Sequence, residues 1–222
     1  MEFTFINEDA INVVVIDNVY NDKQLKSIWK ELEFMTDEDK LRDPHQTGTA
    51  TAPHKGRLIP LKNNKGIFLD PVYRSYEYSP IIKNAIEIIR SEDFINKISG
   101  FNPLFKIIQN CNAVSTLLSY YETSDYYKPH TDHGVFTMLS HYFKEPKKFT
   151  GGNLTLISDT KKVEIEIRNN RSILFPSVTM HSVDMIGMTG DYQAFGGDGR
   201  YCISHFLATG EPPAPPSTEN KS

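Results

Sequence analysis

The sequence predicts an α+β protein in which helices come first and a sandwich or barrel of short strands follows. Apolar residues recur at helical spacing in residues 21–35 and again in residues 79–100. After about residue 103 the pattern changes to short runs rich in β-branched and aromatic residues, separated by turns that contain Gly, Asp, Asn and Pro. Many short strands joined by such turns are typical of β-sandwiches and β-barrels.

The N-terminal part of the chain divides into a strand, a helix, a loop and further helices. The β-branched run INVVVIDNVY predicts a buried strand. A helix is expected to follow it, with Asn21 or Asp22 as the N-cap. Residues 36–65 are polar and rich in Gly, Pro and Thr, which predicts a long loop of a kind that is often functional. Residues 79–100 predict one or two more helices, of which the first is capped by Ser79.

The organisation of the chain is expected to be simple. We predict one domain over residues 1–210, with its β core in about residues 103–208. The C-terminal stretch GEPPAPPSTENKS is polar and rich in proline, so residues 211–222 are expected to form a disordered tail.

Composition and charge narrow the functional classes. The chain of 222 residues has 24 basic and 28 acidic side chains, a net charge of −4 that argues against a nucleic-acid binder. The two cysteines, Cys111 and Cys202, have no CxxC neighbours, so we expect reduced thiols rather than a thiolate zinc site. The N-terminus lacks the basic region of a signal peptide, and no apolar run reaches the ~20 residues of a membrane span. A soluble, cytoplasmic protein without a membrane partner is therefore expected.

The stretch YYKPHTDHG carries the clearest candidate site. Along a strand, side chains alternate between faces, so His130 and Asp132 are expected to point the same way and His133 the other way. His181 opens a later predicted strand and is the candidate third ligand. Two imidazoles and one carboxylate on one side of an ion form the facial triad of non-haem Fe(II) oxygenases. The same side chains also suit catalytic zinc, and the motif alone leaves both metals open.

Other segments stand in a characteristic order around these residues. Tyr121 and Tyr127 precede His130, GGNLTLI follows the His/Asp segment, SILFPS precedes His181, and GRYCISHF comes later. In this order and combination the sequence resembles the 2-oxoglutarate- and Fe(II)-dependent dioxygenases, specifically their prolyl 4-hydroxylase-like branch. The resemblance covers roughly residues 116–206, and the N-terminal helices fit the family only as supports for the sheet.

The resemblance implies a fold and a set of cofactors. The fold is a double-stranded β-helix, or jelly roll, with Fe(II) held by His130, Asp132 and His181. The cofactors are Fe(II), 2-oxoglutarate and O2, with ascorbate as an additional candidate. The carboxylate of Asp132 favours hydroxylation, because related halogenases have a small residue in its place.

Three further residues are implied as cosubstrate ligands. Arg200 matches the basic residue on the last core strand that binds the far carboxylate of 2-oxoglutarate, a task that suits its planar guanidinium. Tyr121 and Tyr142 match tyrosines whose hydroxyls bond the cosubstrate, and the alternative for both is that they fill the barrel as core aromatics. The connection between His181 and Arg200 is longer than in the family, so residues 185–199 are interpreted as an inserted loop near the mouth of the barrel.

The implied activity is hydroxylation of prolyl residues in a peptide or protein, with succinate and CO2 as co-products. Residues 36–65 and 185–199 are expected to flank the iron and clasp an extended prolyl peptide. A hydroxylase of a free amino acid or other small molecule is the alternative within the same chemistry, and the acidic charge balance disfavours a nucleic-acid demethylase. The alternative from another class is a non-catalytic jelly-roll protein that binds a metal or ligand, against which the complete triad and Arg200 argue.

Overall fold

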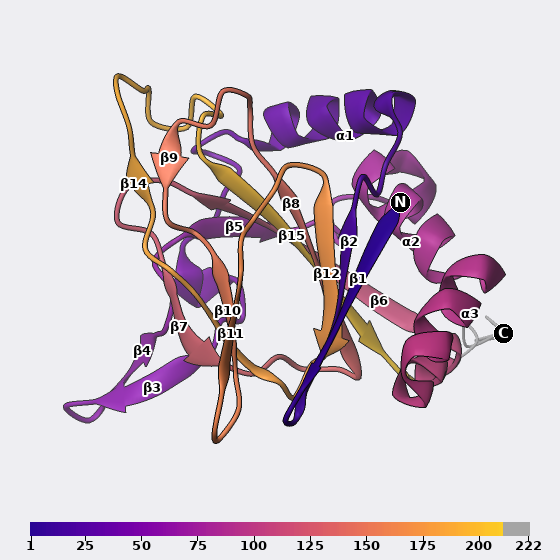
Figure 1. The fold of residues 1–222 in the computed structure, drawn as a ribbon. Helices are drawn as coiled ribbons and strands as arrows, with labels where there is room; N and C mark the ends of the chain where they lie inside the picture. The colour runs from indigo at the N-terminus through magenta and orange to yellow at the C-terminus, as the bar shows by residue number, and fades with distance from the viewer. Residues whose placement is uncertain (211–222) are drawn as a thin grey trace, which may run out of the picture.

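The computed structural model describes residues 1–210, in which two β-sheets pack together and helices cover the outer face of the larger sheet (Figure 1). The larger sheet has the strand order β1 (Glu2–Glu8), β2 (Ile11–Asp17), β12 (Arg171–Pro176), β8 (Phe136–Tyr142), β15 (Arg200–Ala208), β6 (Ala113–Tyr121), β5 (Lys65–Phe68). The smaller sheet has the order β11 (Lys162–Ile165), β10 (Leu154–Ile157), β13 (Met180–Val183), β7 (Tyr127–His130). The disordered tail predicted for residues 211–222 lies outside the described residues.

Strands from both sheets together form a jelly roll. Between β6 and β15 the chain passes repeatedly from one sheet to the other: β6, β8, β12 and β15 are neighbours in the larger sheet, and β7, β10, β11 and β13 make up the smaller one. β1 and β2 extend the larger sheet beyond β12, and β5 extends it beyond β6. The expected fold, α+β with a jelly-roll core, is confirmed.

The two faces of the larger sheet bury two different sets of side chains, because successive residues of a strand point to opposite faces. On β8, Met138 and Tyr142 pack toward the helices, whereas Leu139 packs toward the smaller sheet. On β15, Ile203 belongs to the helix side and Cys202 to the side between the sheets. A cavity between the sheets is therefore lined by the second set.

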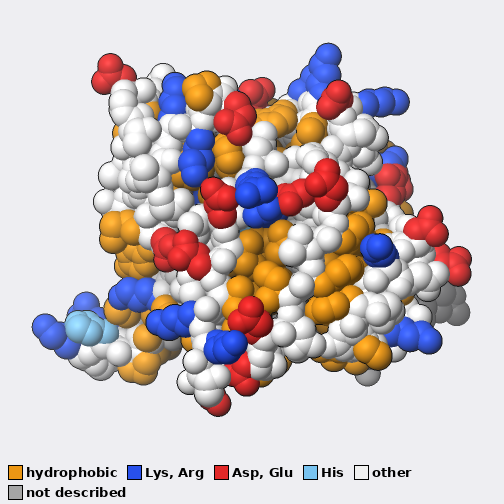
Figure 2. Space-filling model, in the orientation of Figure 1, with side chains coloured by type: hydrophobic (Ala, Val, Ile, Leu, Met, Phe, Trp, Pro, Cys, Tyr) orange, Lys and Arg blue, Asp and Glu red, His pale blue; other side chains and the backbone are white. Residues whose placement is uncertain are grey.

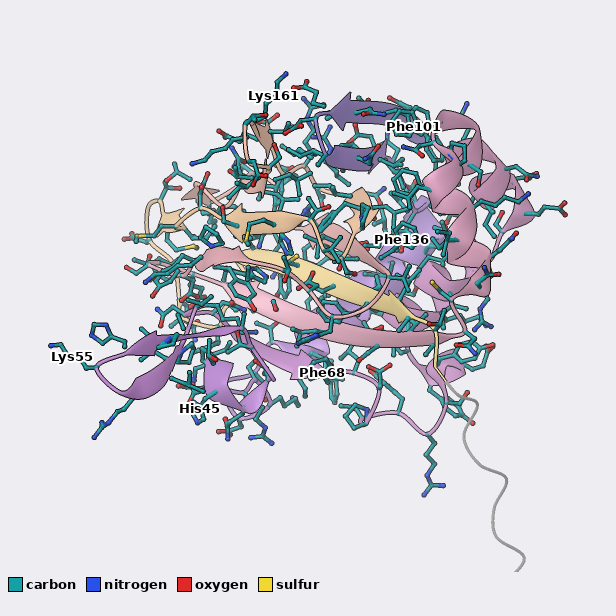
Figure 3. The ribbon with its side chains drawn as sticks, turned by 90° about the horizontal axis from the view of Figure 1, so that it is seen from below. His45, Lys55, Phe68, Phe101, Phe136 and Lys161 are labelled. Carbon is teal, nitrogen blue, oxygen red and sulfur yellow. The ribbon has the colours of Figure 1, made fainter. Side chains whose placement is uncertain are left out.

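The helices cover the outer face of the larger sheet and end where the β core begins. Asn21 caps the first helix in a capping box and Ser79 caps the second, as predicted. Phe136, which Figure 3 labels, points from β8 toward this side and stacks on Phe105 with 5.6 Å between ring centroids. The helical elements are α1 (Asp22–Met35), α2 (Pro80–Ile89), α3 (Glu92–Phe101) and a 3-10 helix (Pro103–Asn110). Because of that 3-10 helix, the β core begins with β6 rather than at residue 103.

Some strands, among them β1, β3 and β4, were not predicted by the sequence analysis. Residues 2–8 form β1, which pairs with β2 along its whole length. Within residues 36–65, predicted as a loop, β3 (Thr51–His54) and β4 (Arg57–Pro60) form a hairpin that projects from the body, with Lys55 at its tip (Figures 1 and 3). Figure 2 shows basic and histidine side chains gathered on this projection. Its side chains are mostly exposed, so the alternating apolar pattern that marks a half-buried strand is absent.

Several bulk expectations can be compared with the described residues. Cys111 and Cys202 are both free thiols, as expected. None of the helices in residues 1–210 combines the length and the apolar character needed to cross a membrane. The assignment of residues 1–210 to one domain stays a prediction.

An ion pair joins the N-terminal strands to the jelly roll. Arg171, at the start of β12, donates from Nε and Nη2 to the two carboxylate oxygens of Asp17 at the end of β2, each at 2.7 Å. Its Nη1 donates to the carbonyl oxygen of Glu166, also at 2.7 Å. The side chains of Arg171 and Asp17 are only 9% and 23% exposed. The hydrogen bond from Arg171 is the main cause that lowers the pKa of Asp17 below its usual range.

We predict that Asp17→Asn lowers the free energy of unfolding at neutral pH by about 1.5–3 kcal/mol, the range for hydrogen bonds to charged groups. Because the pKa of Asp17 is lower in the folded state, its contribution is present above the unfolded pKa and is lost as the pH falls through the folded one. The difference between wild type and variant should therefore shrink in acid. Urea titrations at a series of pH values measure it.

The matched control is Arg168→Gln. Arg168 forms an ion pair with Glu166 on the surface, and both side chains of this pair are 61% exposed. Such a surface pair contributes roughly 0–1 kcal/mol, so little change is expected. Equal effects of the two substitutions, or a difference that persists in acid, would contradict the role given to Asp17.

Candidate functional site

The two candidate histidines lie opposite each other on neighbouring strands. β7 and β13 are antiparallel partners in the smaller sheet, and their register pairs His130 with His181. His130 Nε2 lies 3.6 Å from Asp132 Oδ1, and His181 Nε2 lies 3.4 Å from Asp132 Oδ2. One ligand atom from each residue lies within 4.8 Å of the other two. The three side chains therefore converge in a group of the type that holds one metal ion.

Backbone carbonyls orient both imidazoles. His130 Nδ1 lies 2.8 Å from the carbonyl oxygen of Lys128, and His181 Nδ1 lies 2.9 Å from that of Thr179. A carbonyl oxygen can only accept, so each ring carries its proton on Nδ1 and turns the Nε2 lone pair toward the other two side chains. Burial, and next the neighbouring His181, lower the pKa of His130 to about 3. The ring is therefore neutral at physiological pH, which is the form that ligates a metal.

The carboxylate of Asp132 is held by the loop after β7. Its backbone N donates to the carbonyl oxygen of Ser177 at 2.9 Å, and its Oδ2 accepts from Thr137 Oγ1 at 2.8 Å. The sequence analysis expected the Asp132 side chain to point the same way as that of His130 because both would lie on one strand. This reason is wrong, because β7 ends at His130 and Asp132 lies beyond it. His133, which was expected to point away, lines the same cavity.

Tyr127 supports His130 from one side. The two rings are stacked, with 3.5 Å between their centroids and 13° between their planes. The Tyr127 hydroxyl accepts from Thr49 Oγ1 and from the backbone N of Ala50, both at 3.1 Å. The N-terminal segment thereby fixes the tyrosine that packs on a candidate ligand. The sequence analysis noted Tyr127 only as part of the family pattern and assigned it no role.

A cavity of about 440 Å³ lies at the three side chains. Strands β6, β8 and β15 line it from the larger sheet, β7 and β13 line it from the smaller one, and residues 47–50 and Lys62 line it from the N-terminal segment. Its size falls within the range of small-molecule sites. Apart from histidines, Lys62 and Asp132 are the lining residues that carry charge. The sequence analysis missed Lys62, since a lone lysine in a polar segment gives no signal.

Arg200 opens β15, as predicted, and its side chain is buried without an anionic partner. The residue is 0% exposed, and its Nε and Nη1 have no hydrogen-bond partner among the described residues. Its Cζ lies 4.6 Å from the centroid of the Tyr121 ring, which lines the cavity, whereas Arg200 itself does not. Gly152, at φ +78°, leaves the room that Arg200 needs, because a Cβ there would come within 3.0 Å of Arg200 Cδ.

Tyr142 does not reach this cavity, contrary to the expectation that it bonds the cosubstrate. Its side chain lies on the helix face of β8, with its ring centroid 6.5 Å from that of Tyr20 and 6.3 Å from that of Trp29. The physical reason is strand alternation, which turns the preceding residue, His141, to the opposite face. His141 Nδ1 lies 3.4 Å from Arg200 Nη2, and its buried Nε2 has no partner among the described residues. Burial, then Arg200, lower the pKa of His141, so the ring is neutral beside the guanidinium.

Residues 185–199 lie away from the cavity. None of them lines it, so the expectation that this insertion flanks the metal group is wrong. Its short strand β14 (Gly187–Met188) pairs with β9 (Phe149–Thr150). The backbone N of Phe195 donates to Glu122 Oε1 at 2.9 Å, and the Tyr192 hydroxyl donates to Thr123 Oγ1 at 3.2 Å. The insertion therefore packs over the turn that follows β6.

Among the comparisons with known proteins, the one with solved structures finds similar folds. No family model matches the chain, and no curated protein matches it in sequence. Among solved structures, a prolyl 4-hydroxylase from Pseudomonas putida is similar with a TM-score of 0.57 at 11% identity, over 91% of this chain and 95% of that one. An oxidoreductase of the 2OG-Fe(II) oxygenase family from Burkholderia pseudomallei has a TM-score of 0.52 at 10% identity, over 89% and 85% of the two chains.

A third similar structure is a prolyl hydroxylase from Trichoplax adhaerens in complex with a hypoxia inducible factor peptide fragment. It has a TM-score of 0.51 at 15% identity, over 89% of this chain and 83% of that one. The fold of this chain is thus that of the 2-oxoglutarate- and Fe(II)-dependent oxygenases. The similar structures include prolyl hydroxylases, and the resemblance expected from the sequence is confirmed at the level of the fold.

We predict that His130→Ala, Asp132→Ala and His181→Ala each weaken metal binding by more than about 100-fold. Loss of a residue that merely orients a ligand already costs roughly 10- to 100-fold in affinity, and a lost ligand costs more. Calorimetric titration with Fe(II) under anaerobic conditions, and with Zn(II) in parallel, measures the affinity and separates the two candidate metals.

The control is His54→Ala, on the exposed hairpin far from the group in sequence. It should bind metal like wild type. Wild-type affinity in the Asp132 variant, with an unchanged circular dichroism spectrum, would rule out this metal centre.

Proposed function

We propose that this chain is an Fe(II)- and 2-oxoglutarate-dependent oxygenase that hydroxylates its substrate. The observation that carries the proposal is the convergence of His130, Asp132 and His181 beside a cavity on a jelly-roll fold. Two imidazoles and one carboxylate on one side of an ion leave its other positions free for a cosubstrate and O2.

The buried cation at Arg200 fits the same cofactor set. Removing a guanidinium from water without an opposite charge is costly, and its Nε and Nη1 have no partner among residues 1–210. The far carboxylate of 2-oxoglutarate would supply the missing partner, with Arg200 as the donor of paired hydrogen bonds. His141 and the Tyr121 ring lie beside the guanidinium, and with it they would form this anion site.

Fe(II), 2-oxoglutarate and O2 together supply an oxidant that inserts one oxygen atom into a C–H bond, while the other oxygen atom enters succinate and CO2 is released. The residues of the chain do the positioning. Tyr127 and two backbone carbonyls hold the imidazoles, Thr137 holds the carboxylate of Asp132, and the apolar cavity wall excludes water.

The first substrate that we propose is a prolyl residue in a peptide or protein. The sequence resemblance supports it, as does the peptide complex of the similar hydroxylase from Trichoplax adhaerens. Residues 47–50 line the cavity, and the neighbouring β3–β4 hairpin projects beyond the body, where it would contact a bound chain. A free amino acid or other small acid is the second candidate, which one observation favours: the charged Lys62 inside the cavity.

The proposed activity predicts succinate formation that needs both added Fe(II) and 2-oxoglutarate and that disappears in the Asp132→Ala variant. Succinate is measured by mass spectrometry, first without added substrate and then with each candidate substrate. A library of proline-containing peptides is then screened for a mass gain of one oxygen. The proposal is refuted if wild type forms no succinate that depends on Fe(II) and 2-oxoglutarate, or if the Asp132→Ala variant forms as much as wild type.

We further predict that Arg200→Ala weakens 2-oxoglutarate binding by about 30-fold or more, because losing one partner of a desolvated charge pair costs roughly 2–5 kcal/mol. Binding is measured by calorimetry with Mn(II) in place of iron, which avoids turnover. Arg200→Lys keeps the charge and should recover part of the affinity, which guards against a merely misfolded alanine variant. The exposed Arg168 provides the control substitution, Arg168→Ala. Unchanged affinity in a folded Arg200→Ala protein would move the role to another residue.

A further inference from the structure

Lys62 is a buried cation that faces the cavity and has no opposite charge. The residue is only 3% exposed, and it lines the cavity. Among residues 1–210 no hydrogen bond or ion pair joins its Nζ to another side chain, and the ammonium lies 5.6 Å from the centroid of the Tyr127 ring. Burial lowers its pKa to about 8, and the nearby Cys202 and Asp132 act in the opposite direction. The ammonium form therefore prevails at neutral pH, although burying it is unfavourable.

The backbone fixes the direction of this side chain. Lys62 forms a bridge with Tyr127, the residue that stacks on His130. On either side of it, the backbone N of Lys128 donates to the Leu61 carbonyl oxygen at 2.9 Å, and that of Asn63 donates to the carbonyl oxygen of Tyr126 at 3.2 Å. Residues directly opposite each other in an antiparallel pair share a face, so Lys62 and Tyr127 both point into the cavity. The backbone of Lys62 is therefore held in place against residues 126–128, and its side chain forms part of the cavity wall.

Charge balance indicates what Lys62 binds. With the cofactors of the proposed function bound, the metal ion, Arg200 and Lys62 carry one positive charge more than Asp132 and the carboxylates of 2-oxoglutarate. Lys62 and Asp132 are the charged lining residues besides histidines, so the described walls do not neutralise this charge. An excess charge in a buried cavity is unfavourable unless a bound group neutralises it. We therefore expect the ammonium of Lys62 to pair with an anionic group of the substrate.

We propose that Lys62 binds a carboxylate of the substrate, so that the substrate is a molecule with a free carboxylate close to the oxidised carbon: a free amino acid or the C-terminal residue of a peptide. This inference rests on the proposed oxygenase function and specifies its substrate class. Lys62 comes from the N-terminal wall beside β7, and Arg200 comes from β15 in the other sheet. The two cations therefore hold two different carboxylates.

The first experiment separates the cosubstrate from the substrate. 2-Oxoglutarate is titrated by calorimetry into Mn(II)-loaded wild type and Lys62→Met, whose side chain has similar length but no charge. The affinities should agree within about twofold. A loss of affinity like that of the Arg200 variant would assign Lys62 to the cosubstrate and overturn the proposal.

The second experiment uses matched acids and amides as probes. The common L-amino acids and their carboxamides, and proline-containing peptides with a free or an amidated C-terminus, are offered to the iron-loaded enzyme with 2-oxoglutarate. Wild type should add one oxygen to acids but not to the matching amides. Lys62→Met should lower kcat/KM for the acid by about 30-fold or more, the loss expected for one partner of a buried charge pair. Lys62→Arg should retain part of the activity. The control Lys106→Met, on an exposed side chain of the 3-10 helix Pro103–Asn110, should retain all of it.

Binding gives a readout that does not depend on turnover. In ligand-observed NMR, the protein is loaded with Zn(II), which is diamagnetic and supports no turnover, and with 2-oxoglutarate. The acid that wild type oxidises should bind wild type and not Lys62→Met. The free amino acids and the C-terminal acids are separate arms, so the result identifies the source of the carboxylate. Equal oxidation of amides and acids, equal activity of Lys62→Met, or oxygen addition only at internal prolyl residues would each overturn the proposal, as would the absence of any oxidised acid. Metal-dependent succinate formation without added substrate tests the oxygenase function separately, so the two failures are distinguishable.

Discussion

The pairing of β7 with β13 is the constraint on which the candidate site depends. Antiparallel register places His130 opposite His181, and directly paired residues bring their side chains to the same face at close range. A slip of one residue would turn one imidazole to the other face of the sheet. The outer support of β7 comes from residues 61–63 of the N-terminal segment, which hydrogen-bond to it and close the cavity on that side. The site thus needs both the jelly roll and the segment that precedes it.

Buried charge divides the cavity into two regions. Arg200 lies behind Tyr121 with His141 as its neighbour, in contact with the larger sheet, and Lys62 lies on the wall next to β7. Neither cation forms an ion pair with an acidic side chain of residues 1–210, and a buried cation is stabilised when an anion pairs with it. Two separate carboxylates therefore explain the arrangement better than one. His130, Asp132 and His181 line the same cavity as Lys62 and Tyr121.

The similar solved structures give the fold but not the substrate. Their identities of 10–15% are too low to transfer specificity, which depends on a few side chains at the walls of a site rather than on the sheet itself. In this chain the side chains that bear on specificity are local features of the site. They include Lys62 in the N-terminal wall, which lines the cavity, and His141 beside Arg200, whereas residues 185–199 pack away from the cavity.

The sequence by itself determined the two capped helices, the strand-rich second half of the chain and the metal-ligand candidates, because these depend on periodicity, caps and motif spacing. The position of Arg200 at the start of the last core strand followed from the family resemblance. Tertiary structure alone decided that His141 rather than Tyr142 lies beside Arg200, because the pairing of β8 selects the face on which each side chain lies. It also decided the role of Lys62, which lies 68 positions before His130 in the chain and meets that strand only through a long-range backbone bridge. Contacts between distant segments leave no local pattern, so their consequences are visible only in the folded chain.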